Sequence, residues 1–471
     1  MTYQKLSQNF NNSSFKKMIK TLIIALLFFI LTPTDNINAQ NRNTDLPPTL
    51  HDSGLTAIQT EIIIDSIGNK LRTNYIFPEI AEKMLSKLEN NLSKGFYKSI
   101  DDPMEFANKL TQDLQSVSND IHLRVIYAPE MIAEEQKVVT AADSLKFINK
   151  QIDRMKRENF GFKEVKILDG NIGYLNLKGF FKAQYAGETA VAAMNFLSNT
   201  DALIIDLRQN GGGTPGIIQL ITSYLYGAEN MVHLNTIYWK PTDTYTHTYT
   251  LPHVSGKRNP FADIYILTSS RTFSAAEEFS YNLKQLKRAT LIGETTGGGA
   301  HAGGMEFLTD RFAMWIPAGN AINPISNTNW EGTGVVPHIK VKAEQALEIA
   351  QITALDSLSK KTQDLQMKHY YEWHLKTQKA LLNPIKIEPD ILKSYTGRYN
   401  ERVVTFENGK LYYQRGDRGK YELTPLSEDE FKLKGLPDFR IRFILENNTV
   451  IALEGYYDDG RTDRDLKSPK K

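Results

Sequence analysis

The central part of the chain alternates short apolar runs with longer amphipathic segments, and this alternation constrains the fold more than any other feature. Apolar runs predict strands at residues 174–177, 202–207, 264–267 and 289–292, and the segments between them predict helices at 188–197, 215–225 and 274–286. Repeated strand–helix–strand units form a largely parallel sheet with helices packed on its faces. In such sheets the functional site lies at the carboxyl ends of the strands. We therefore expect an α/β core of residues 119–345.

Different patterns flank this core. Residues 40–118 have helical periodicity, with an apolar stripe at Ile80, Met84, Leu85 and Leu88, and predict an N-terminal helical domain. Residues 346–383 predict a helical linker. From residue 384 to 471 the chain has short strands and turns, and Asn408-Gly409 is a strong hairpin signal. We therefore expect a small all-β accessory domain at the C-terminus.

The first 39 residues have the organisation of a secretory signal peptide. Lys16, Lys17 and Lys20 precede an apolar run of ten residues, from Leu22 to Leu31. The small residue Ala39 ends the segment. The run is shorter than the roughly 20 residues that span a bilayer. We therefore predict cleavage after Ala39, export to a periplasm or to the medium, and no stable membrane anchor in the mature chain.

Composition excludes several classes of protein. The 56 Lys and Arg residues nearly balance the 54 Asp and Glu residues, so the chain lacks the basic excess of a nucleic-acid-binding protein. Cysteine is absent, which excludes disulfides, thiolate nucleophiles and thiolate zinc sites. The spacings of the common zinc and calcium motifs do not occur either, so we predict no metal and no cofactor.

One serine stands where the strand of residues 264–267 passes through a turn into the next helix. Ser274 should lie at the helix N-terminus, close to its partial positive charge and its free amides. An oxyanion formed by attack of its hydroxyl could accept a hydrogen bond from the N–H of Ala275. The residues also read Ser-x-x-Glu, because Glu277 follows at the third position, and this pattern is a helix-capping box. The local pattern alone leaves both a nucleophile and a cap open.

Three glycines follow the buried strand of residues 202–207, in the segment DLRQNGGG at residues 206–213. Glycines at the end of a strand let the backbone approach a ligand closely and point its amides outward. Gly212 or Gly213 could thus donate a second N–H to an oxyanion. A tight turn that needs positive φ explains the glycines equally well. A phosphate loop does not fit, because no Gly-Lys-Ser/Thr follows.

Three motifs in this order resemble those of the carboxyl-terminal-processing (tail-specific) serine peptidases: DLRQNGGG at 206–213, TFSAAEE at 272–278 and GETTGG at 293–298. That group includes the tricorn-protease core and the repeats of the interphotoreceptor retinoid-binding protein. The resemblance covers roughly residues 119–345. It implies a crotonase-like ββα core and hydrolysis of peptide bonds through an acyl-enzyme on Ser274. By motif position it implies an oxyanion hole formed by Gly213, or its neighbour Gly212, and Ala275.

The resemblance also indicates which residue activates Ser274. The tail-specific branch has a lysine just after its GExTxG motif, where this chain has Gly299. The tricorn and retinoid-binding-protein branch has a histidine in a strand similar to NDIHLRV, residues 119–125 here. The resemblance to this branch implies that His122 is the general base. It also implies that Glu331, in EGTGVVP at residues 331–337, orients the His122 ring. His301, after the glycine run, is a second candidate base.

Two functions remain to be distinguished. The first is an exported serine peptidase that acts on peptides or proteins. The second is a catalytically weak or silent binder of an apolar ligand on the same fold, similar to the retinoid-binding relatives. Because a binder has no need of a complete set of Ser274, His122 and Glu331, the sequence favours the peptidase.

Overall fold

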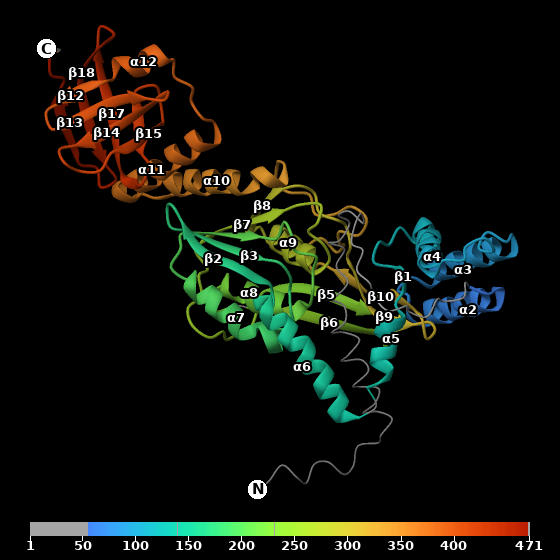
Figure 1. Ribbon diagram of the computed structural model, residues 1–471. Helices are drawn as coiled ribbons and strands as arrows, with labels where there is room; N and C mark the ends of the chain where they lie inside the picture. The colour runs from blue at the N-terminus through green and yellow to red at the C-terminus, as the bar shows by residue number, and fades with distance from the viewer. Residues whose placement is uncertain (1–54, 139, 230, 470–471) are drawn as a thin grey trace. The chain divides into compact units, whose positions relative to one another are not determined.

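A computed structural model describes residues 55–138, 140–229 and 231–469 (Figure 1). The predicted signal peptide lies outside these residues. Within them, no helix has both the length and the apolar character needed to cross a membrane. The chain forms two compact units. Of the described residues, the first unit contains those of 55–166, 174–199 and 205–343, and the second contains those of 167–173, 200–204 and 344–469.

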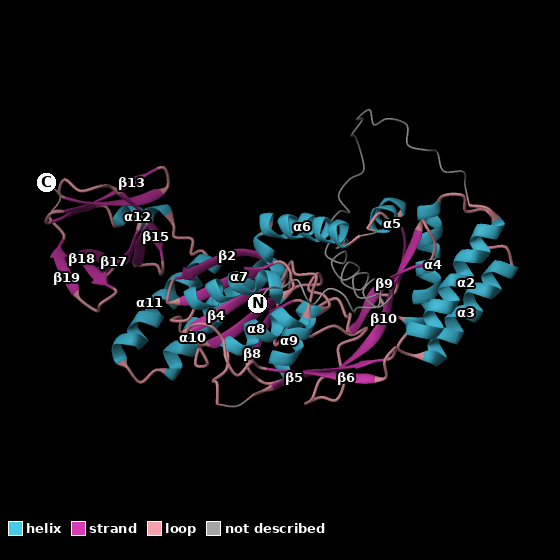
Figure 2. Ribbon diagram, turned by 90° about the horizontal axis from the view of Figure 1, so that it is seen from below, coloured by secondary structure: helices cyan, strands magenta, loops and turns pink. Residues whose placement is uncertain are grey.

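Three helices form the N-terminal part of the first unit: α2 (Ala57–Asn74), α3 (Pro78–Ser93) and α4 (Pro103–Ser118). Thr56 begins α2 with a capping box, and the Asp102 side chain caps α4. The apolar stripe predicted for α3 is largely confirmed, because Met84, Leu85 and Leu88 are buried. Figure 2 shows the three helices beside one end of β10 (Phe312–Ile322), with which they share a hydrophobic core.

The segment after α4 differs from the sequence-based prediction. The alternation of apolar and polar residues from Ile121 to Val125 predicts a strand with Ile121 on its buried face, but Ile121 is 43% exposed and His122 is buried. Asn119 ends α4 in the left-handed region at φ 55°, and a turn follows in which the Leu123 N–H donates to the Asp120 carbonyl. Strand β1 therefore starts only at Arg124 and runs to Tyr127. Helices α5 (Pro129–Gln136) and α6 (Ala141–Arg157) and a 3₁₀ turn (Asn159–Gly161) come next.

The predicted α/β core is confirmed. Its six-stranded sheet has the order β11-β8-β7-β4-β3-β2, and β8 pairs in parallel with both β7 and β11. Helix α7 packs against α8, and α8 against α9. The bounds are β2 (Phe162–Leu168), β3 (Ile172–Leu177), α7 (Ala183–Phe196), β4 (Ala202–Asp206), α8 (Pro215–Tyr224), β7 (Asp263–Thr268), α9 (Ala275–Gln285), β8 (Ala289–Gly293) and β11 (Ile339–Lys340).

A second sheet in the first unit is antiparallel. Its order is β1-β10-β5-β6, and β9 pairs with β10 in a hairpin. The remaining bounds are β5 (His233–Trp239), β6 (Thr244–Tyr249) and β9 (His301–Phe307). The loop between β8 and β9 connects the two sheets along the chain, and it carries the glycine run of residues 297–299 at the end of the GETTGG motif.

The second unit contains the all-β domain expected at the C-terminus. Its eight strands pair in sequence order and are all antiparallel, and a bridge between Tyr399 and Lys467 nearly closes the sheet. The predicted turn at Asn408-Gly409 joins β13 to β14. The bounds are α10 (Ala346–Lys361), α11 (Leu365–Leu382), α12 (Pro389–Ser394), β12 (Gly397–Tyr399), β13 (Arg402–Glu407), β14 (Lys410–Arg415), β15 (Tyr421–Pro425), β16 (Glu430–Leu433), β17 (Leu436–Glu446), β18 (Thr449–Tyr457) and β19 (Thr462–Leu466).

Candidate active site

Ser274 immediately precedes α9 and has a strained backbone. Its φ of 55° and ψ of −120° lie in a region that non-glycine residues rarely adopt. Strain of this kind is costly and is concentrated at functional sites. The predicted capping box is present, because the Glu277 carboxylate accepts a hydrogen bond from the Ser274 N–H at 2.8 Å. The cap and a serine at the positive end of a helix therefore coexist in one structure.

Glu277 does more than cap the helix. Its buried carboxylate also accepts hydrogen bonds from the Thr296 hydroxyl at 2.5 Å and from the N–H groups of Gly298 at 2.6 Å and Gly299 at 2.8 Å. Burial raises the pKa of Glu277 to about 7, against the opposing effect of these hydrogen bonds. The carboxylate thus fixes the loop after β8 to the start of α9, a role that the Ser-x-x-Glu spacing did not reveal.

The side chain of Asn210 holds the glycine loop against Ser274. Its Nδ2 donates to the Leu177 carbonyl at 3.0 Å, and its Oδ1 accepts from the Gly212 N–H at 2.9 Å. Its backbone carbonyl accepts from the Phe273 N–H at 3.1 Å. A Cβ at Gly212 would lie 2.8 Å from the Cβ of Ser274, so this approach requires glycine.

Two backbone amides have no backbone hydrogen-bond partner within the described part of the chain: that of Gly213, which follows the glycine packed on Ser274, and that of Ala275, which follows Ser274 itself. Phe180 bonds to the Gly212 carbonyl and the Thr214 N–H, which leaves the Gly213 N–H on the other side of the loop. Gly212 was the alternative donor to an oxyanion, but its N–H already donates a hydrogen bond to the Asn210 side chain. Gly213 is therefore the better candidate.

The imidazole of His122 packs on the ring of Phe273, the residue directly before Ser274, with 4.6 Å between ring centroids. A Cβ at Gly299 would lie 2.5 Å from Cε1 of His122. The histidine ring therefore fills the space beside the position where the tail-specific branch has its lysine. Burial lowers the pKa of His122 to about 4, the charge of Asp120 opposes this shift, and His301 adds to it. At neutral pH the ring is uncharged and able to accept a proton.

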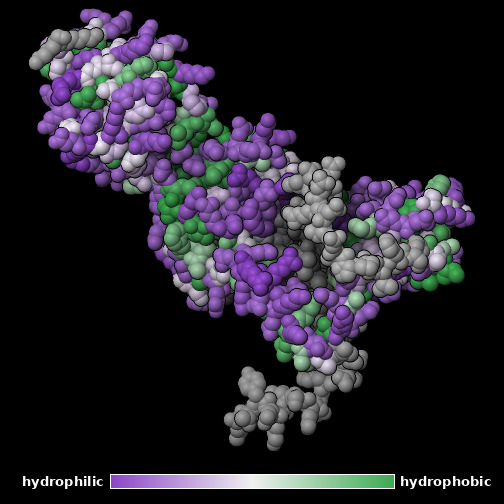
Figure 3. All heavy atoms as spheres, in the orientation of Figure 1, coloured by the Kyte–Doolittle hydropathy of each residue, from purple (hydrophilic) through white to green (hydrophobic). Residues whose placement is uncertain are grey.

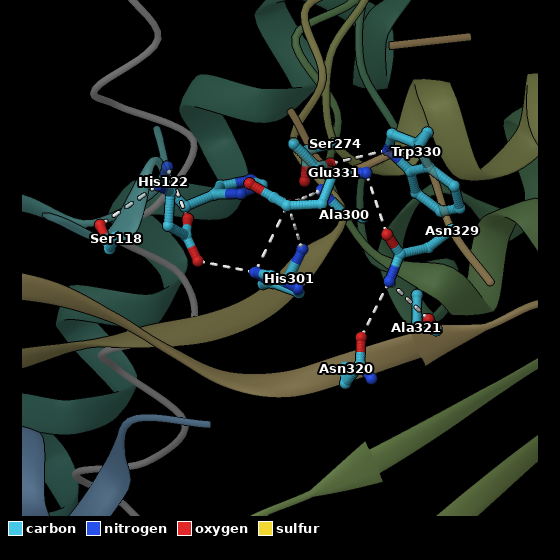
Figure 4. Close-up of polar contacts among 12 residues, drawn as sticks. Ser118, His122, Ser274, Ala300, His301, Asn320, Ala321, Asn329, Trp330 and Glu331 are labelled. Carbon is cyan, nitrogen blue, oxygen red and sulfur yellow. Dashed lines mark hydrogen bonds and ion pairs between the residues drawn. The ribbon is translucent and has the colours of Figure 1, made fainter. Parts of the chain in front are cut away.

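Glu331 approaches His122 from the loop after β10. Its Oε2 accepts hydrogen bonds from the N–H groups of Ala300 at 2.5 Å and His301 at 3.2 Å. Its Oε1 and the Nδ1 of His122 are buried without a hydrogen-bond partner in the described structure. Figure 4 shows the side chains of Ser274, His122 and Glu331 converging on one place. Burial raises the pKa of Glu331 to about 7, and the neighbouring Asp120 adds to the rise.

Asp120 and His301 complete a polar network that the sequence did not predict. The Nδ1 of His301 lies 2.7 Å from Oδ2 of Asp120 and 3.5 Å from Oε2 of Glu331. The other oxygen of Asp120, Oδ1, accepts a hydrogen bond from the backbone N–H of His122. Burial acts to lower the pKa of His301, but the two carboxylates outweigh it and the pKa is raised. His301 thus lies between carboxylates, while His122 has the position next to Phe273.

The acidic side chains near His122 also offer oxygen ligands to a cation. One potential ligand atom from each of Asp120, His122 and Glu331 lies within 4.8 Å of the other two. The same closeness suits a carboxylate that orients an imidazole, so the geometry serves either chemistry.

Two family models match the chain and decide its classification. Peptidase family S41 matches residues 171–341, which include Ser274 and Glu331. The N-terminal domain of Peptidase_S41 in eukaryotic IRBP matches residues 56–156, which include His122. The chain belongs to peptidase family S41. This S41 peptidase is a serine peptidase, and the resemblance found in its motifs is confirmed.

Solved structures also match the S41 peptidase, at low identity. A Bacteroides fragilis protein assigned to the S41 proteases is 22% identical with a TM-score of 0.36, and the match covers 47% of this chain and 58% of that one. Mature CPAF is 13% identical over 69% of this chain and 97% of its own, with a TM-score of 0.41. The tricorn protease is 14% identical over 68% and 37%, with a TM-score of 0.40. At these TM-scores the superpositions carry no weight, and the assignment rests on the family models.

Proposed function

We propose that this chain is an exported serine peptidase that hydrolyses peptide bonds through an acyl-enzyme on Ser274, with His122 as general base and Glu331 as its orienting carboxylate. The observation that carries the proposal is the position of Ser274. Ser274 immediately precedes α9 with a strained backbone, packs against Gly212 of the glycine loop, and directly follows Phe273, whose ring contacts that of His122. Export rests on the signal-peptide pattern of residues 1–39.

The same groups act in both halves of the proposed reaction, and in each half His122 is first a base and then an acid. The Ser274 hydroxyl attacks the scissile carbonyl carbon and its proton passes to His122, while the N–H groups of Gly213 and Ala275 stabilise the oxyanion. His122 then protonates the leaving amine as the C–N bond breaks, and the acyl group stays on Ser274. In the second half His122 takes a proton from water, the hydroxide attacks the acyl carbon, and the ester C–O bond breaks as His122 returns the proton to Ser274, which releases the acid product. Glu331 stabilises the imidazolium that forms in both halves.

Reaction of the purified mature chain with a fluorophosphonate tests the proposal without knowledge of the substrate. An activated serine displaces fluoride and forms a covalent phosphonyl adduct, which peptide mapping by mass spectrometry should place on Ser274. We expect His122→Ala to slow labelling by several orders of magnitude, because the hydroxyl then has no base. Ser280→Ala is a matched control, since Ser280 is a buried serine of the same helix that bonds only to the Ala276 carbonyl.

Two outcomes would contradict the assignment. Unchanged labelling in His122→Ala together with loss of labelling in His301→Ala would make His301 the base. No adduct on a protein that circular dichroism shows to be folded would overturn the acyl-enzyme, and would leave the binder of an apolar ligand as the function to test.

A further inference from the structure

A cavity of about 380 Å³ borders the glycine loop, and none of Asp120, His122, His301 and Glu331 is among its lining residues. Its lining includes Gly211, Gly212 and Gly213, together with the end of α6 and the start and end of the β2–β3 pair. Gly212 links the cavity to the reacting serine, because it lines the cavity and a Cβ on it would lie 2.8 Å from the Cβ of Ser274. A substrate whose scissile carbonyl lies at Ser274 therefore has a neighbouring residue within reach of this cavity.

The polar lining of the cavity is mainly cationic. Arg157, Lys163 and Lys178 face it, and Glu158 is its single acidic residue. None of the three cations forms an ion pair with another described residue. Neighbouring cations in the sequence are paired: Lys156 with Asp153 at 3.4 Å, Arg154 with Glu158 at 3.9 Å and Lys166 with Glu164 at 2.9 Å. Figure 3 shows that hydrophilic residues predominate on the face of the molecule turned to the viewer.

The wall of the cavity is built from unusual backbone. Asn159, Phe160 and Gly161 have φ of 48°, 51° and 82°, three successive residues in the left-handed region. A Cβ at Gly161 would lie 2.7 Å from the Gly179 carbonyl oxygen and 3.1 Å from the ring of Phe181. Strained, side-chain-free backbone of this kind persists where the surrounding structure holds it, and it is concentrated at binding and catalytic sites. Here it brings the end of α6 close to the glycine loop.

The partial burial of Lys178 contributes to the preference of this cavity for an anionic ligand. Burial lowers the pKa of Lys178, and the nearby charges of Arg208 and Lys163 act in the same direction, against the opposing effect of Asp206. A cation held in this way gains from a carboxylate brought by a ligand. Phe181 is buried at the base of the same cavity and offers an apolar surface to the methylene groups of an acidic side chain.

We propose that this cavity is a substrate subsite that selects a carboxylate next to the scissile bond, with Arg157, Lys163 and Lys178 as its cationic recognition groups. The inference rests on the proposed function of Ser274 and deepens it by assigning a substrate class. The carboxylate can belong to an aspartate or glutamate side chain or to the end of the substrate chain, and the two sources are separated below.

Cleavage-site profiling of the mature protein tests the subsite. A peptide library from a digested proteome is incubated with the protein, and the new termini are identified by mass spectrometry. We expect a carboxylate at one fixed position beside the cleaved bond. For a peptide pair that differs by Glu or Gln at that position, the ratio of kcat/KM should fall roughly tenfold in Lys163→Glu and in Arg157→Glu, the loss expected for one hydrogen bond between charged groups.

Lys156→Glu is the matched control. This substitution makes the same change of charge one residue before Arg157, but Lys156 does not line the cavity. Thermal unfolding shows which variants are folded. A second readout uses Ser274→Ala, in which binding of the same fluorescent peptide pair is followed by anisotropy. Preferential binding of the Glu peptide, weakened by added salt, supports the subsite even if turnover is slow.

The sources of the carboxylate are separated with amidated peptides. Loss of cleavage on amidation of the C-terminus assigns the subsite to the chain end, and loss on Glu→Gln exchange assigns it to an acidic side chain. Indifference to both changes would overturn the inference. Fluorophosphonate labelling of Ser274 in the wild-type protein would still support the peptidase in that case, so the two failures are distinguishable.

Discussion

At the scale of single residues, Gly299 separates the two ways in which a serine of this family could be activated. The ring of His122 occupies the space into which a side chain at this position would project, since a Cβ would lie 2.5 Å from Cε1 of His122 and 2.3 Å from Cζ of Phe273. We predict that Gly299→Ala displaces the imidazole and lowers kcat/KM by roughly a hundredfold, the usual cost of a small misplacement of a catalytic group.

The matched control for this substitution is Gly304→Ala. Gly304 lies in β9, and no atom stands within 4 Å of a Cβ built there. Steady-state kinetics on one peptide substrate should show the loss in Gly299→Ala alone. Equal activity of the two variants would mean that the position of His122 against Phe273 is not needed for the reaction.

Glu331 should govern the pH dependence of the reaction. Burial raises its pKa to about 7 and lowers that of His122 to about 4. Below pH 7 the carboxyl of Glu331 is therefore neutral and unable to stabilise an imidazolium, while His122 still lacks its proton. We predict that kcat/KM rises as pH increases through about 7, and that Glu331→Gln removes this rise and lowers kcat by roughly 10⁴-fold. A rise centred near pH 4 in the wild-type protein would assign the profile to His122 instead.

Sequence motifs could select Ser274, His122 and Glu331 as candidates because each lies in a short segment with a family pattern, and Figure 4 shows the three side chains close together. They could not identify Asp120 as a partner of His301, since the two residues are 181 positions apart and only the fold brings them within 2.7 Å. The hydrogen bond that occupies the Gly212 N–H depends on a side-chain rotamer of Asn210, which no spacing predicts.

At the scale of elements, the junction between α9 and the loop after β8 depends on Glu277. Four hydrogen bonds reach its carboxylate from groups on both segments. We predict that Glu277→Ala lowers the free energy of unfolding by roughly 3 kcal/mol or more, because four hydrogen bonds are lost and buried donors are left unpaired. Chemical denaturation measures the change. Ser280→Ala on the same helix removes one hydrogen bond to a backbone carbonyl and should cost about 1 kcal/mol.

The strands of the core were predictable because buried parallel strands are continuous apolar runs with clear ends. Helix α7 was less so. It starts at Ala183 rather than near residue 188, since its first turns contain Gln184, Tyr185 and Gly187, which do not show an apolar stripe. The turn at His122 was read as strand because alternation of apolar and polar residues does not reveal the left-handed Asn119 that ends α4.

At the scale of the whole molecule, every residue assigned to the reaction belongs to the first unit, and the second unit has charged interactions of its own. In the latter, the buried carboxylate of Glu430 accepts hydrogen bonds from Lys376 and Arg442, each at 2.6 Å, and lies 3.5 Å from Arg440. Burial acts to raise the pKa of Glu430, but Lys376 and Arg442 outweigh it and the pKa lies below its ordinary value of 4.5. Its stabilising effect is therefore complete above pH 4.5 and is lost as pH falls through the lowered pKa.

We predict that Glu430→Gln lowers the free energy of unfolding of the second unit by roughly 3–5 kcal/mol at pH 7, because the substitution leaves the buried Arg440 without its carboxylate. The variant should also lose the part of the acid sensitivity that this carboxylate causes. Calorimetry on the full chain measures both effects, with the exposed Glu428→Gln as control, expected within about 0.5 kcal/mol of the wild type. Under conditions where both units are folded, fluorophosphonate labelling of Ser274 should keep its wild-type rate. A slower rate in Glu430→Gln would show that the C-terminal β domain contributes to the chemistry and is more than an attached module.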